Sequence, residues 1–425
     1  MSESPFASDD GRRDPPAPGP ASAPAPSSPG AAPPAPAAGK AERLVSLDAY
    51  RGFIMLLMAS AGFGLAKVAK LPQFQGSDLW QFLGYQTGHA EWAGCAFWDL
   101  IQSSFMFMVG VAMPYSYASR QARGESPATQ AVHAAYRSIA LVLLGMFLIS
   151  NWSNQTQFSF TTVLPQIGLG YFFVFLLLDR GPRVQLVAIA GILVAYWLYF
   201  LLYPAPQPDF DWKAVGVPDD AKKMTGLFAH WNKNANAAAA FDRWFLNLFP
   251  RSKEFLFEGG GYQTLNFVPS MATMLFGVLA GTLLRGPRAP MEKLVRLAVA
   301  GTVCLAAGGI LGWTLCPIVK RIWTPSWAVY SAGWAYLMLA GFYWVTDIRG
   351  WRRWAFPLVV VGMNSIAVYV MSMLMREWLG KTLKTHLGES FLTGTYAPIR
   401  ETVSILFFFW LVSLWMHRRK IFLRI

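Results

Sequence analysis

The chain has 425 residues, of which 54% are hydrophobic and only 14% are charged. A soluble domain carries about a quarter charged residues, so this composition excludes an ordinary soluble globular protein. A formal net charge of +13 can indicate a nucleic-acid partner. Here most basic residues lie in short loops at the ends of apolar segments, where membrane topology accounts for them. We expect an all-α, polytopic membrane helix bundle whose partner is the lipid bilayer and not a nucleic acid.

The first 42 residues differ from the remainder in composition. They contain 11 of the 28 prolines, mixed with Ala, Ser and Gly, and Phe6 is their only aromatic residue. Such a segment cannot bury enough apolar surface to offset the entropy lost on ordering. We predict a disordered cytoplasmic tail over residues 1–42, followed by a membrane domain over residues 43–425.

Apolar stretches of about 18 to 25 residues recur beyond this tail, long enough to cross roughly 30 Å of hydrocarbon as helices. A further amphipathic stretch, from Trp80 to Trp92, is expected at the membrane interface. About ten transmembrane helices are predicted, at 47–66, 95–118, 134–151, 161–179, 184–203, 265–284, 293–316, 327–346, 356–376 and 401–417.

Short-loop lysines and arginines predict the orientation, because they are enriched on the cytoplasmic side of membrane proteins. Alternate span ends are basic, whereas the loop 151–160 has no charged residue. Both termini are therefore expected in the cytoplasm. The basic ends carry Arg43 and Arg51; Arg120, Arg123 and Arg137; Arg180 and Arg183; Arg285, Arg288, Lys293 and Arg296; Arg349, Arg352 and Arg353; and Arg418, Arg419 and Lys420.

Two segments on the opposite side are longer than turns, at 68–94 and at 204–264, and long loops of this kind are often functional. The second contains His230-Trp231-Asn232-Lys233-Asn234. Aromatic planes next to amides suit sugar rings, which have apolar faces and hydroxylated edges. A loop whose tryptophans lie at the level of the lipid headgroups explains the same composition.

Histidines are few, and they are the side chains best suited to act as a base near neutral pH. His89 ends the first long external segment and precedes Asp99 by ten residues, at the start of an apolar span. An acid–base pair is one interpretation; a helix-capping Asp and an interfacial His is the other. The three cysteines, Cys95, Cys304 and Cys316, have no metal-ligand spacing, so we expect no metal site.

Other polar residues fall within the apolar spans, where they are costly and are candidates for function. Asn364 places an amide inside the predicted bundle, and hydrogen bonding between helices is the structural alternative. Asp48 and Arg51 share a helix face at the cytoplasmic edge. They are expected to form either a local ion pair or an anion site for a phosphate-bearing cofactor.

Several motifs in order along residues 43–376 resemble the heparan-alpha-glucosaminide N-acetyltransferase family and its bacterial relatives. Each is weak alone, and their number and order carry the resemblance. They are Arg43-Leu-Val-Ser-Leu-Asp48-Ala-Tyr-Arg51-Gly52, His89-Ala-Glu-Trp92, Trp98-Asp99-Leu-Ile, Phe105-Met-Phe-Met-Val-Gly110, Leu164-Pro-Gln166-Ile-Gly168, Phe241-Asp242-Arg243, Phe276-Gly-Val-Leu-Ala-Gly281, Trp323-Thr-Pro-Ser326, Asp347-Ile-Arg-Gly350 and Gly362-Met-Asn364-Ser365-Ile-Ala-Val-Tyr369.

The resemblance implies an integral inner-membrane acyltransferase that moves an acetyl group from cytosolic acetyl-coenzyme A to an amino sugar or glycan on the far side. Its catalytic histidine matches His89, as general base or acyl carrier, with Asp99 to orient the imidazole and Asn364 or Gln102 to meet the oxyanion. The expected cofactor-binding residues are Arg43, Asp48 and Arg51, and the expected substrate-binding residues are Glu91, Trp92, Asp242, Arg243 and Asn266.

One position departs from the family pattern. Where the resemblance implies an active-site Asn in the first helix, a gap-free alignment from Arg51 gives Gly62, so another amide, Asn266 or Asn364, must supply that group or the chemistry differs. A transporter or flippase for a sugar or lipid-linked glycan remains the main alternative, and a catalytically silent scaffold is the third. The acceptor and the oligomeric state, including a homodimer, are left open.

Overall fold

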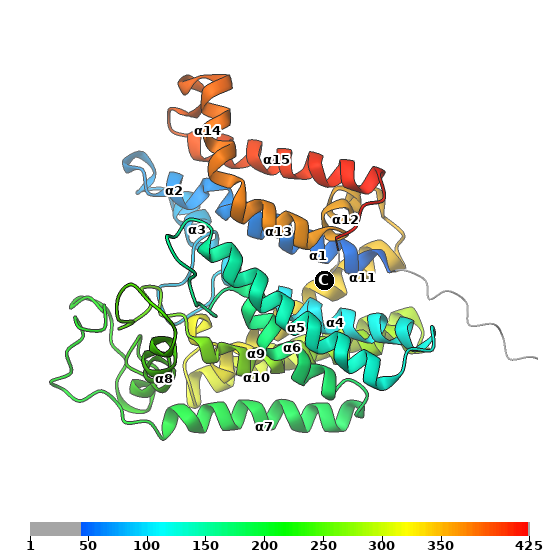
Figure 1. The fold of residues 1–425 in the computed structure, drawn as a ribbon, viewed down its shortest axis with the longest axis horizontal. Coiled ribbons are helices and arrows are strands. Elements are labelled where there is room, and N and C mark those ends of the chain that lie inside the picture. Colours follow the sequence, from blue (N-terminus) through cyan, green and yellow to red (C-terminus); the bar gives the residue numbers. More distant parts are fainter. Residues whose placement is uncertain (1–43, 424–425) are drawn as a thin grey trace, which may run out of the picture. The chain divides into compact units, whose positions relative to one another are not determined.

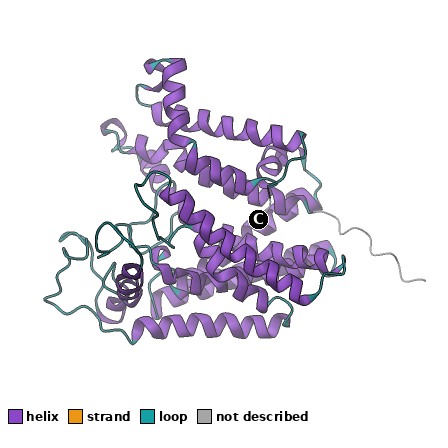
Figure 2. Cartoon of the chain, viewed as in Figure 1, coloured by secondary structure: helices purple, strands orange, loops and turns teal. Residues whose placement is uncertain are grey.

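The computed structural model describes residues 44–423, and every regular element among them is helical (Figure 2). The predicted tail, 1–42, and Arg43 lie outside the described residues. The helices are α1 (Val45–Ala59), α2 (Leu65–Ala69), α3 (Asp78–Gln86), α4 (Leu100–Gln121), α5 (Pro127–Ser150), α6 (Val163–Leu176), α7 (Gly181–Leu201), α8 (Ala237–Phe245), α9 (Phe267–Arg285), α10 (Pro290–Thr314), α11 (Pro325–Tyr343), α12 (Phe356–Gly362), α13 (Ser365–Leu374), α14 (Arg376–Leu387) and α15 (Ala397–Arg418).

The helices within residues 44–423 form two groups that meet at α1. In the first group α4 packs along α9, α5 along α6 and α10 along α11, while in the second α12 and α13 pack on α1 and α15 packs on α12. Figure 1 shows α13 and α15 on one side of α1 and α9 and α10 on the other. Because α1 also contacts α4 and α11, it connects the two groups.

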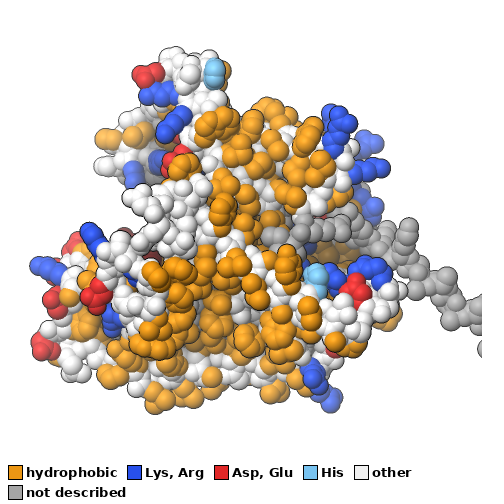
Figure 3. Space-filling view, viewed as in Figure 1, with side chains coloured by type: hydrophobic (Ala, Val, Ile, Leu, Met, Phe, Trp, Pro, Cys, Tyr) orange, Lys and Arg blue, Asp and Glu red, His pale blue; other side chains and the backbone are white. Residues whose placement is uncertain are grey.

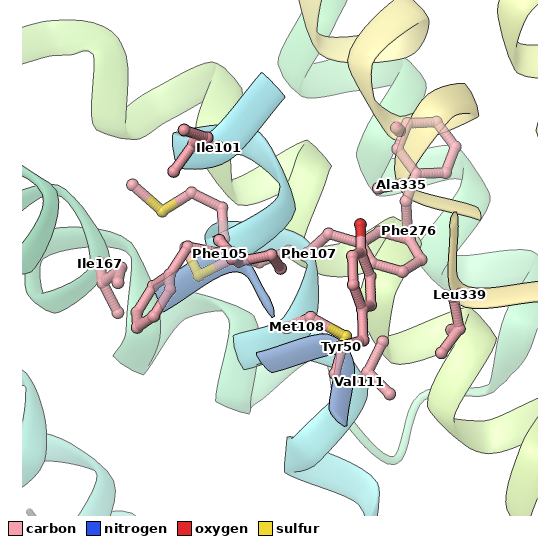
Figure 4. Close-up of a cluster of buried hydrophobic side chains, with 14 of the residues drawn as sticks. Tyr50, Ile101, Phe105, Phe107, Met108, Val111, Ile167, Phe276, Ala335 and Leu339 are labelled. Atoms are coloured by element: carbon pink, nitrogen blue, oxygen red, sulfur yellow. The ribbon is translucent and has the colours of Figure 1, made fainter. Parts of the chain in front are cut away.

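Large apolar side chains from α1, α4, α9 and α11 converge in one core (Figure 4). Phe107 of α4 lies edge-on to Tyr336 of α11, with ring centroids 4.8 Å apart. The Tyr336 hydroxyl donates to the Phe276 carbonyl of α9 at 2.7 Å, so this polar group is satisfied inside the core.

Glycines allow the closest helix contacts. A Cβ placed on Gly277 of α9 would lie 2.0 Å from the Phe107 carbonyl oxygen of α4, and one on Gly52 of α1 would lie 1.8 Å from the Leu358 carbonyl oxygen of α12. Small residues of this kind let helix backbones approach in membrane bundles. The register of both helix pairs therefore depends on these positions.

Five helices are long and apolar enough to cross a membrane, namely α5, α7, α9, α10 and α15, and the total is seven if each of two bent pairs counts as one span. The bent pairs are α1 with Ala61–Ala69, at 45°, and Arg353–Gly362 with α13, at 66°. The other three predicted spans correspond to α4, α6 and α11. Helix α6 is apolar but has only 14 residues, fewer than a helix needs to cross the hydrocarbon core, and α4 and α11 are largely buried among the other helices. The count of ten therefore stays a prediction.

The surface agrees with a lipid environment. Figure 3 shows hydrophobic side chains across the middle of this face, with charged side chains gathered towards two opposite ends. On α10, Val295, Val299 and Val303 are spaced by four residues and are each more than half exposed. Such a continuous exposed apolar stripe is typical of a helix that faces lipid and not water. These features indicate an integral membrane protein.

The 204–264 segment is ordered by buried amides. Trp231 has no exposed surface and stacks on Phe200 of α7, with ring planes 4° apart. Asn234 donates to the Val215 and Glu258 carbonyls, and Asn232 holds the backbone of Met224. The His230–Asn234 motif was expected to bind sugar or to lie among headgroups, but both expectations fail for Trp231, because its indole is enclosed by protein.

Candidate active site

His89 lies in the non-helical segment between α3 and the short 3-10 turn Phe97–Asp99, which leads directly into α4. Its Nδ1 is 2.7 Å from Oδ1 of Asp99. Because an ionised carboxylate can only accept hydrogen bonds, Nδ1 carries the proton in this pair and Nε2 keeps its lone pair. The His89 side chain is 37% exposed, and Nε2 has no hydrogen-bond partner within residues 44–423. Nε2, which has a free lone pair, is the nitrogen suited to accept a proton.

Asp99 is held more firmly than a surface carboxylate. It is 1% exposed, and its Oδ2 accepts the backbone N–H groups of Ala90 and Ala96, both at 3.1 Å. Burial by itself would raise the pKa of the Asp99 carboxyl, but the His89 hydrogen bond, the Lys320 charge and the two backbone donors together hold that pKa below its usual value. Asp99 is thus an ionised group that fixes the ring of His89.

Lys320 is the third charged group of the site, and it comes from the turn Lys320–Ile322 between α10 and α11. Its Nζ lies 3.7 Å from Asp99 Oδ1 and 3.3 Å from His89 Nδ1. Since Nδ1 donates to Asp99, the lysine pairs with the carboxylate and not with the ring. Burial lowers the pKa of Lys320 to about 8, against the opposing charge of Asp99.

Tyr262 completes the polar cluster. Its hydroxyl oxygen accepts from Lys320 Nζ at 3.2 Å, and its ring lies under two cations, 5.3 Å from Lys320 Nζ and 5.7 Å from the Arg321 guanidinium. The Tyr262 backbone N–H donates to Glu258 Oε2 at 2.8 Å. Burial raises the pKa of the phenol to about 12, although Arg321 opposes this, so Tyr262 is a neutral hydrogen-bond donor.

Arg321 joins the segments that carry these groups. It donates to the Gly260 carbonyl at 2.6 Å and to the Ala90 carbonyl at 3.4 Å. Asn266, a predicted substrate-binding residue, is 2% exposed and donates to the Arg321 carbonyl at 2.8 Å, while its Oδ1 has no partner among the described residues. The structure therefore brings Asn266 to the site as a support for the Lys320 turn.

The remaining predicted substrate-binding residues divide into exposed and buried positions. Glu91 is exposed two residues after His89, and Trp92 donates from Nε1 to the Trp231 carbonyl at 2.9 Å. Asp242 has no exposed surface and accepts the Thr264 backbone N–H at 2.9 Å, and burial raises its pKa to about 6. Arg243 donates to the Asn234 carbonyl. Asp242 is enclosed and cannot contact a substrate in this conformation.

Of the predicted cofactor-binding residues, Asp48 and Arg51 lie on α1 away from His89, whereas Arg43 lies outside the described residues. Asp48 and Arg51 form an ion pair at 3.5 Å. At 1.5 Å per residue, Asp48 lies about 20 Å along the chain from Gly62. Asn364 is also distant from the dyad, because its amide binds the backbone of Ile421 and Leu423 at the end of the chain. Asn364 is thus tied to the C-terminal segment and is not brought to His89.

Gly62 interrupts the first span next to the dyad. Ala61, Gly62, Phe63 and Gly64 all have left-handed backbone conformations, with φ of 44°, 73°, 52° and 71°. A Cβ on Gly62 would lie 2.7 Å from the Thr87 carbonyl oxygen. Any side chain there would displace the segment that carries His89, which explains why glycine occupies this position.

The sequence suggested the pairing of His89 with Asp99, which the structure brings into contact, but it did not suggest that Lys320, Arg321 and Tyr262 lie beside them. Lys320 is 231 residues from His89, so spacing gives no indication of their contact. One signal was available: Lys320 and Arg321 precede the Trp323-Thr-Pro-Ser326 motif with only Ile322 between them, and they lie between apolar segments on the side poor in basic residues. A lysine in such a place is expected to have a buried anionic partner.

Comparison with known proteins finds distant relatives of this chain. The chain is 25% identical to "Heparan-alpha-glucosaminide N-acetyltransferase" of Homo sapiens over 373 residues, covering 77% of this chain and 52% of that protein. It is 24% identical to the protein of the same description from Mus musculus over 375 residues, covering 78% of this chain and 53% of that protein. The chain thus spans about half the length of these curated relatives. No protein-family model matches the chain.

Proposed function

We propose that this chain, a distant relative of the heparan-alpha-glucosaminide N-acetyltransferases, is a membrane acyltransferase. In this proposal it moves an acetyl group from acetyl-coenzyme A to the amino group of a sugar or glycan. The observation that carries the proposal is the His89–Asp99 pair, with a buried, multiply hydrogen-bonded carboxylate at 2.7 Å from Nδ1 on a His89 side chain that is partly exposed. A His oriented by a carboxylate is a recurrent acyl-transfer base.

The chemistry requires a neutral amine and a stabilised oxyanion. The amine nitrogen forms a bond to the thioester carbon, the carbonyl π electrons move to oxygen, and the amine proton passes to His89 Nε2. Collapse of the tetrahedral intermediate breaks the C–S bond, and the proton on Nε2 neutralises the departing thiolate. Asp99 stays ionised throughout and stabilises the imidazolium.

The donor is proposed to enter from the end of α1 that carries Asp48 and Arg51, in the cytoplasm, whereas the acceptor approaches His89 from the opposite side. Arginines bind phosphates bidentately, which suits the coenzyme's charged end. Between the two ends a cavity of about 10 Å³ is lined by Leu57 of α1, Leu100 of α4 and Met338 of α11, among others. That is room for at most one water molecule, so passage of the pantetheine arm needs α1 and α4 to separate.

The acceptor is proposed to meet the exposed surface beside His89. Glu91 is exposed there, and its carboxylate suits an amino sugar, whose amine is partly protonated at neutral pH. The half-buried indole of Trp92 offers an apolar face for a sugar ring. Arg243 is partly buried beside Asn234, so it is proposed to act on the acceptor only through this loop.

The test is transfer of label from [acetyl-¹⁴C]acetyl-coenzyme A to glucosamine by the purified full chain in lipid nanodiscs. His89→Ala is expected to abolish transfer while thermal unfolding stays within a few degrees of wild type, because the side chain is at the protein surface. His386→Ala is the matched control, since His386 is exposed in α14, and it should keep full activity. Wild-type turnover in His89→Ala would remove His89 from the mechanism.

Whether His89 accepts a proton or the acetyl group itself is settled by trapping. Wild-type protein quenched in acid after mixing with labelled donor alone is expected to retain label on His89 only if an acyl-histidine forms. Label in peptides containing His89 therefore supports acyl transfer through histidine, and its absence at full turnover supports direct attack.

A transporter for a sugar or lipid-linked glycan is the second candidate, and one observation favours it. The two bent spans, at 45° and 66°, pack against each other through α1 and α12, and broken helices in partnered positions are common in transporters. Sugar counterflow in vesicles without any acyl donor, unaffected by His89→Ala, would favour this function over acyl transfer.

A further inference from the structure

The Tyr262 hydroxyl carries a proton that no described residue accepts. The buried ammonium of Lys320 orients this hydroxyl. Its oxygen accepts from Lys320 Nζ at 3.2 Å, and no residue within 44–423 accepts the hydroxyl proton in return. The Lys320 side chain is 7% exposed, whereas Tyr262 is only partly buried. Tyr262 is thus the residue of this pair that is more open to a ligand.

Tyr262 and His89 lie close to each other, because both contact the Lys320 ammonium. Lys320 Nζ is 3.3 Å from His89 Nδ1 and 3.2 Å from the Tyr262 oxygen, so the phenol oxygen and the imidazole cannot be more than about 6.5 Å apart, the sum of these contacts. This limit applies to Nδ1, and Nε2 lies about 2 Å away from Nδ1 across the ring, so both groups are near enough for one bound thioester to contact them, as acyl transfer requires.

We propose that Tyr262 is a catalytic residue whose hydroxyl donates a hydrogen bond to the oxyanion formed from the thioester carbonyl, and that Lys320 is the positioning residue that orients it. This inference rests on the proposed acyltransferase function. As the amine bonds to the carbonyl carbon, the π electrons move to oxygen, and the Tyr262 O–H strengthens its bond to that oxygen without losing its proton. When the C–S bond breaks, the electrons return to the carbonyl and the bond weakens again.

The surrounding charges suit a donor that stays protonated. Groups facing Lys320 are His89 and Asp99, Cys95, Arg321 and Tyr262. The cations at 5.3 and 5.7 Å from the phenol ring draw electron density from it and make its proton a better donor. Burial keeps the phenol pKa near 12, so the hydroxyl does not ionise at neutral pH.

An ion pair with a purely structural role is the alternative explanation for Lys320. Asp99 is already satisfied by His89, Ala90 and Ala96, so it does not need a lysine for hydrogen bonding. A buried lysine that adds no required hydrogen bond to Asp99 costs desolvation energy. Contact with the Tyr262 oxygen gives it a second role that the structural explanation lacks.

The first experiment replaces the hydroxyl without changing the ring. Tyr262→Phe in nanodiscs is expected to lower kcat for acetyl transfer to glucosamine by about 10²-fold, with KM for acetyl-coenzyme A unchanged, because only the intermediate is affected. Tyr199→Phe deletes a hydroxyl that binds the Ala237 carbonyl away from the site and serves as the control, expected to keep kcat. An unchanged kcat in Tyr262→Phe would overturn the proposal.

The second experiment tests Lys320 through its charge. The pKa of about 8 means that the ammonium is present below this pH and lost above it, so wild-type kcat should fall as pH rises through about 8. Lys320→Arg keeps the charge to higher pH, and the ratio of its rate to the wild-type rate should rise across this range. Taking the ratio cancels titration of the acceptor amine. A constant ratio would mean that Lys320 does not orient the donor.

The two proposals fail in different ways. If His89→Ala keeps activity, the acyltransferase mechanism falls and the Tyr262 result has no bearing on it. If His89→Ala is inactive while Tyr262→Phe turns over at the wild-type rate, only the assignment of Tyr262 is wrong, and the oxyanion donor must be another group.

Discussion

The chemistry of a single carboxylate connects much of the site. Asp99 binds His89 Nδ1, two backbone N–H groups and the charge of Lys320. It therefore sets the tautomer of the imidazole and balances a buried cation at the same time. Removal of its charge should affect both rate and stability.

Asp99→Asn is expected to lower kcat by about 10³-fold or more, because a neutral amide no longer stabilises the imidazolium or selects the reactive tautomer. It should also reduce the free energy of unfolding by up to about 3 to 5 kcal/mol, because Lys320 loses its buried partner. Steady-state kinetics and chemical denaturation in nanodiscs measure the two effects.

Asp220→Asn is the control for this substitution, since Asp220 is exposed in the 204–264 segment. It should leave the free energy of unfolding, and the activation free energy that corresponds to kcat, within about 0.5 kcal/mol of wild type. Equal activity in Asp99→Asn and wild type would show that the 2.7 Å contact does not orient the base.

The sequence located part of this site by residue type. His89 was identifiable because few histidines exist and because an acid followed at a span start, which favours function in lipid. The groups that complete the site come from the turn after α10 and from the loop before α9. Their positions depend on how α9, α10 and α11 pack, and no local pattern near residue 89 contains that information.

At the level of helices, close approach through glycine decides which helices pair. Gly277 of α9 stands against the Phe107 carbonyl of α4, at 2.0 Å from a would-be Cβ. Helix α4 follows Asp99 and α9 follows Tyr262, so their contact sets the distance between the two parts of the site.

Gly277→Ala is expected to lower the free energy of unfolding by about 1 to 3 kcal/mol, because the methyl group forces the α4 and α9 backbones apart. Acetyl transfer should weaken with it. Gly309→Ala on α10, where a Cβ would meet nothing within 4 Å, should leave stability unchanged or slightly raised. Thermal unfolding of both variants measures the difference, and equal midpoints would contradict the close contact.

Long apolar stretches predicted where helices lie, whereas the number of membrane spans stays a prediction. Each of the ten predicted ranges overlaps a helix or a bent pair, but the start of α4 moved from 95 to Leu100 because residues 95–99 form the turn that presents Asp99. Burial also misled the motif analysis. Trp231 and Asn234 looked suited to sugar, whereas their neighbours in the fold, Phe200 and Val215, enclose them.

For the molecule as a whole, orientation in the membrane decides which compartment supplies each substrate. The loop of residues 121–125 carries Arg123, and the loop 151–160 at the opposite end of α5 has no charge. The positive-inside rule predicts that the first loop is cytoplasmic and that the second lies on the opposite side.

Single cysteines at Arg123 and Trp152 test this orientation, in a background where Cys95, Cys304 and Cys316 are replaced. Trp152 is 66% exposed, so a cysteine there is expected to react with a membrane-impermeant maleimide in intact cells. A cysteine at Arg123 should react only after the cells are permeabilised. The reverse pattern would put His89 in the cytoplasm with the donor and remove the need for transfer across the membrane.

The left-handed stretch Ala61–Gly64 gives the first span an energetic asymmetry. Ala61 and Phe63 have side chains that disfavour this conformation by roughly 1 to 2 kcal/mol each. The fold offsets that cost through contacts made by the residues around the bend, including the approach of Gly62 to Thr87. If those contacts loosened, α1 and α2 would tend to straighten into one continuous helix. His89, two residues after Thr87, would then lose the contacts that hold its segment in place. The bend is therefore a strained segment that supports the position of His89. Its relaxation would inactivate the site without changing any residue that takes part in the reaction.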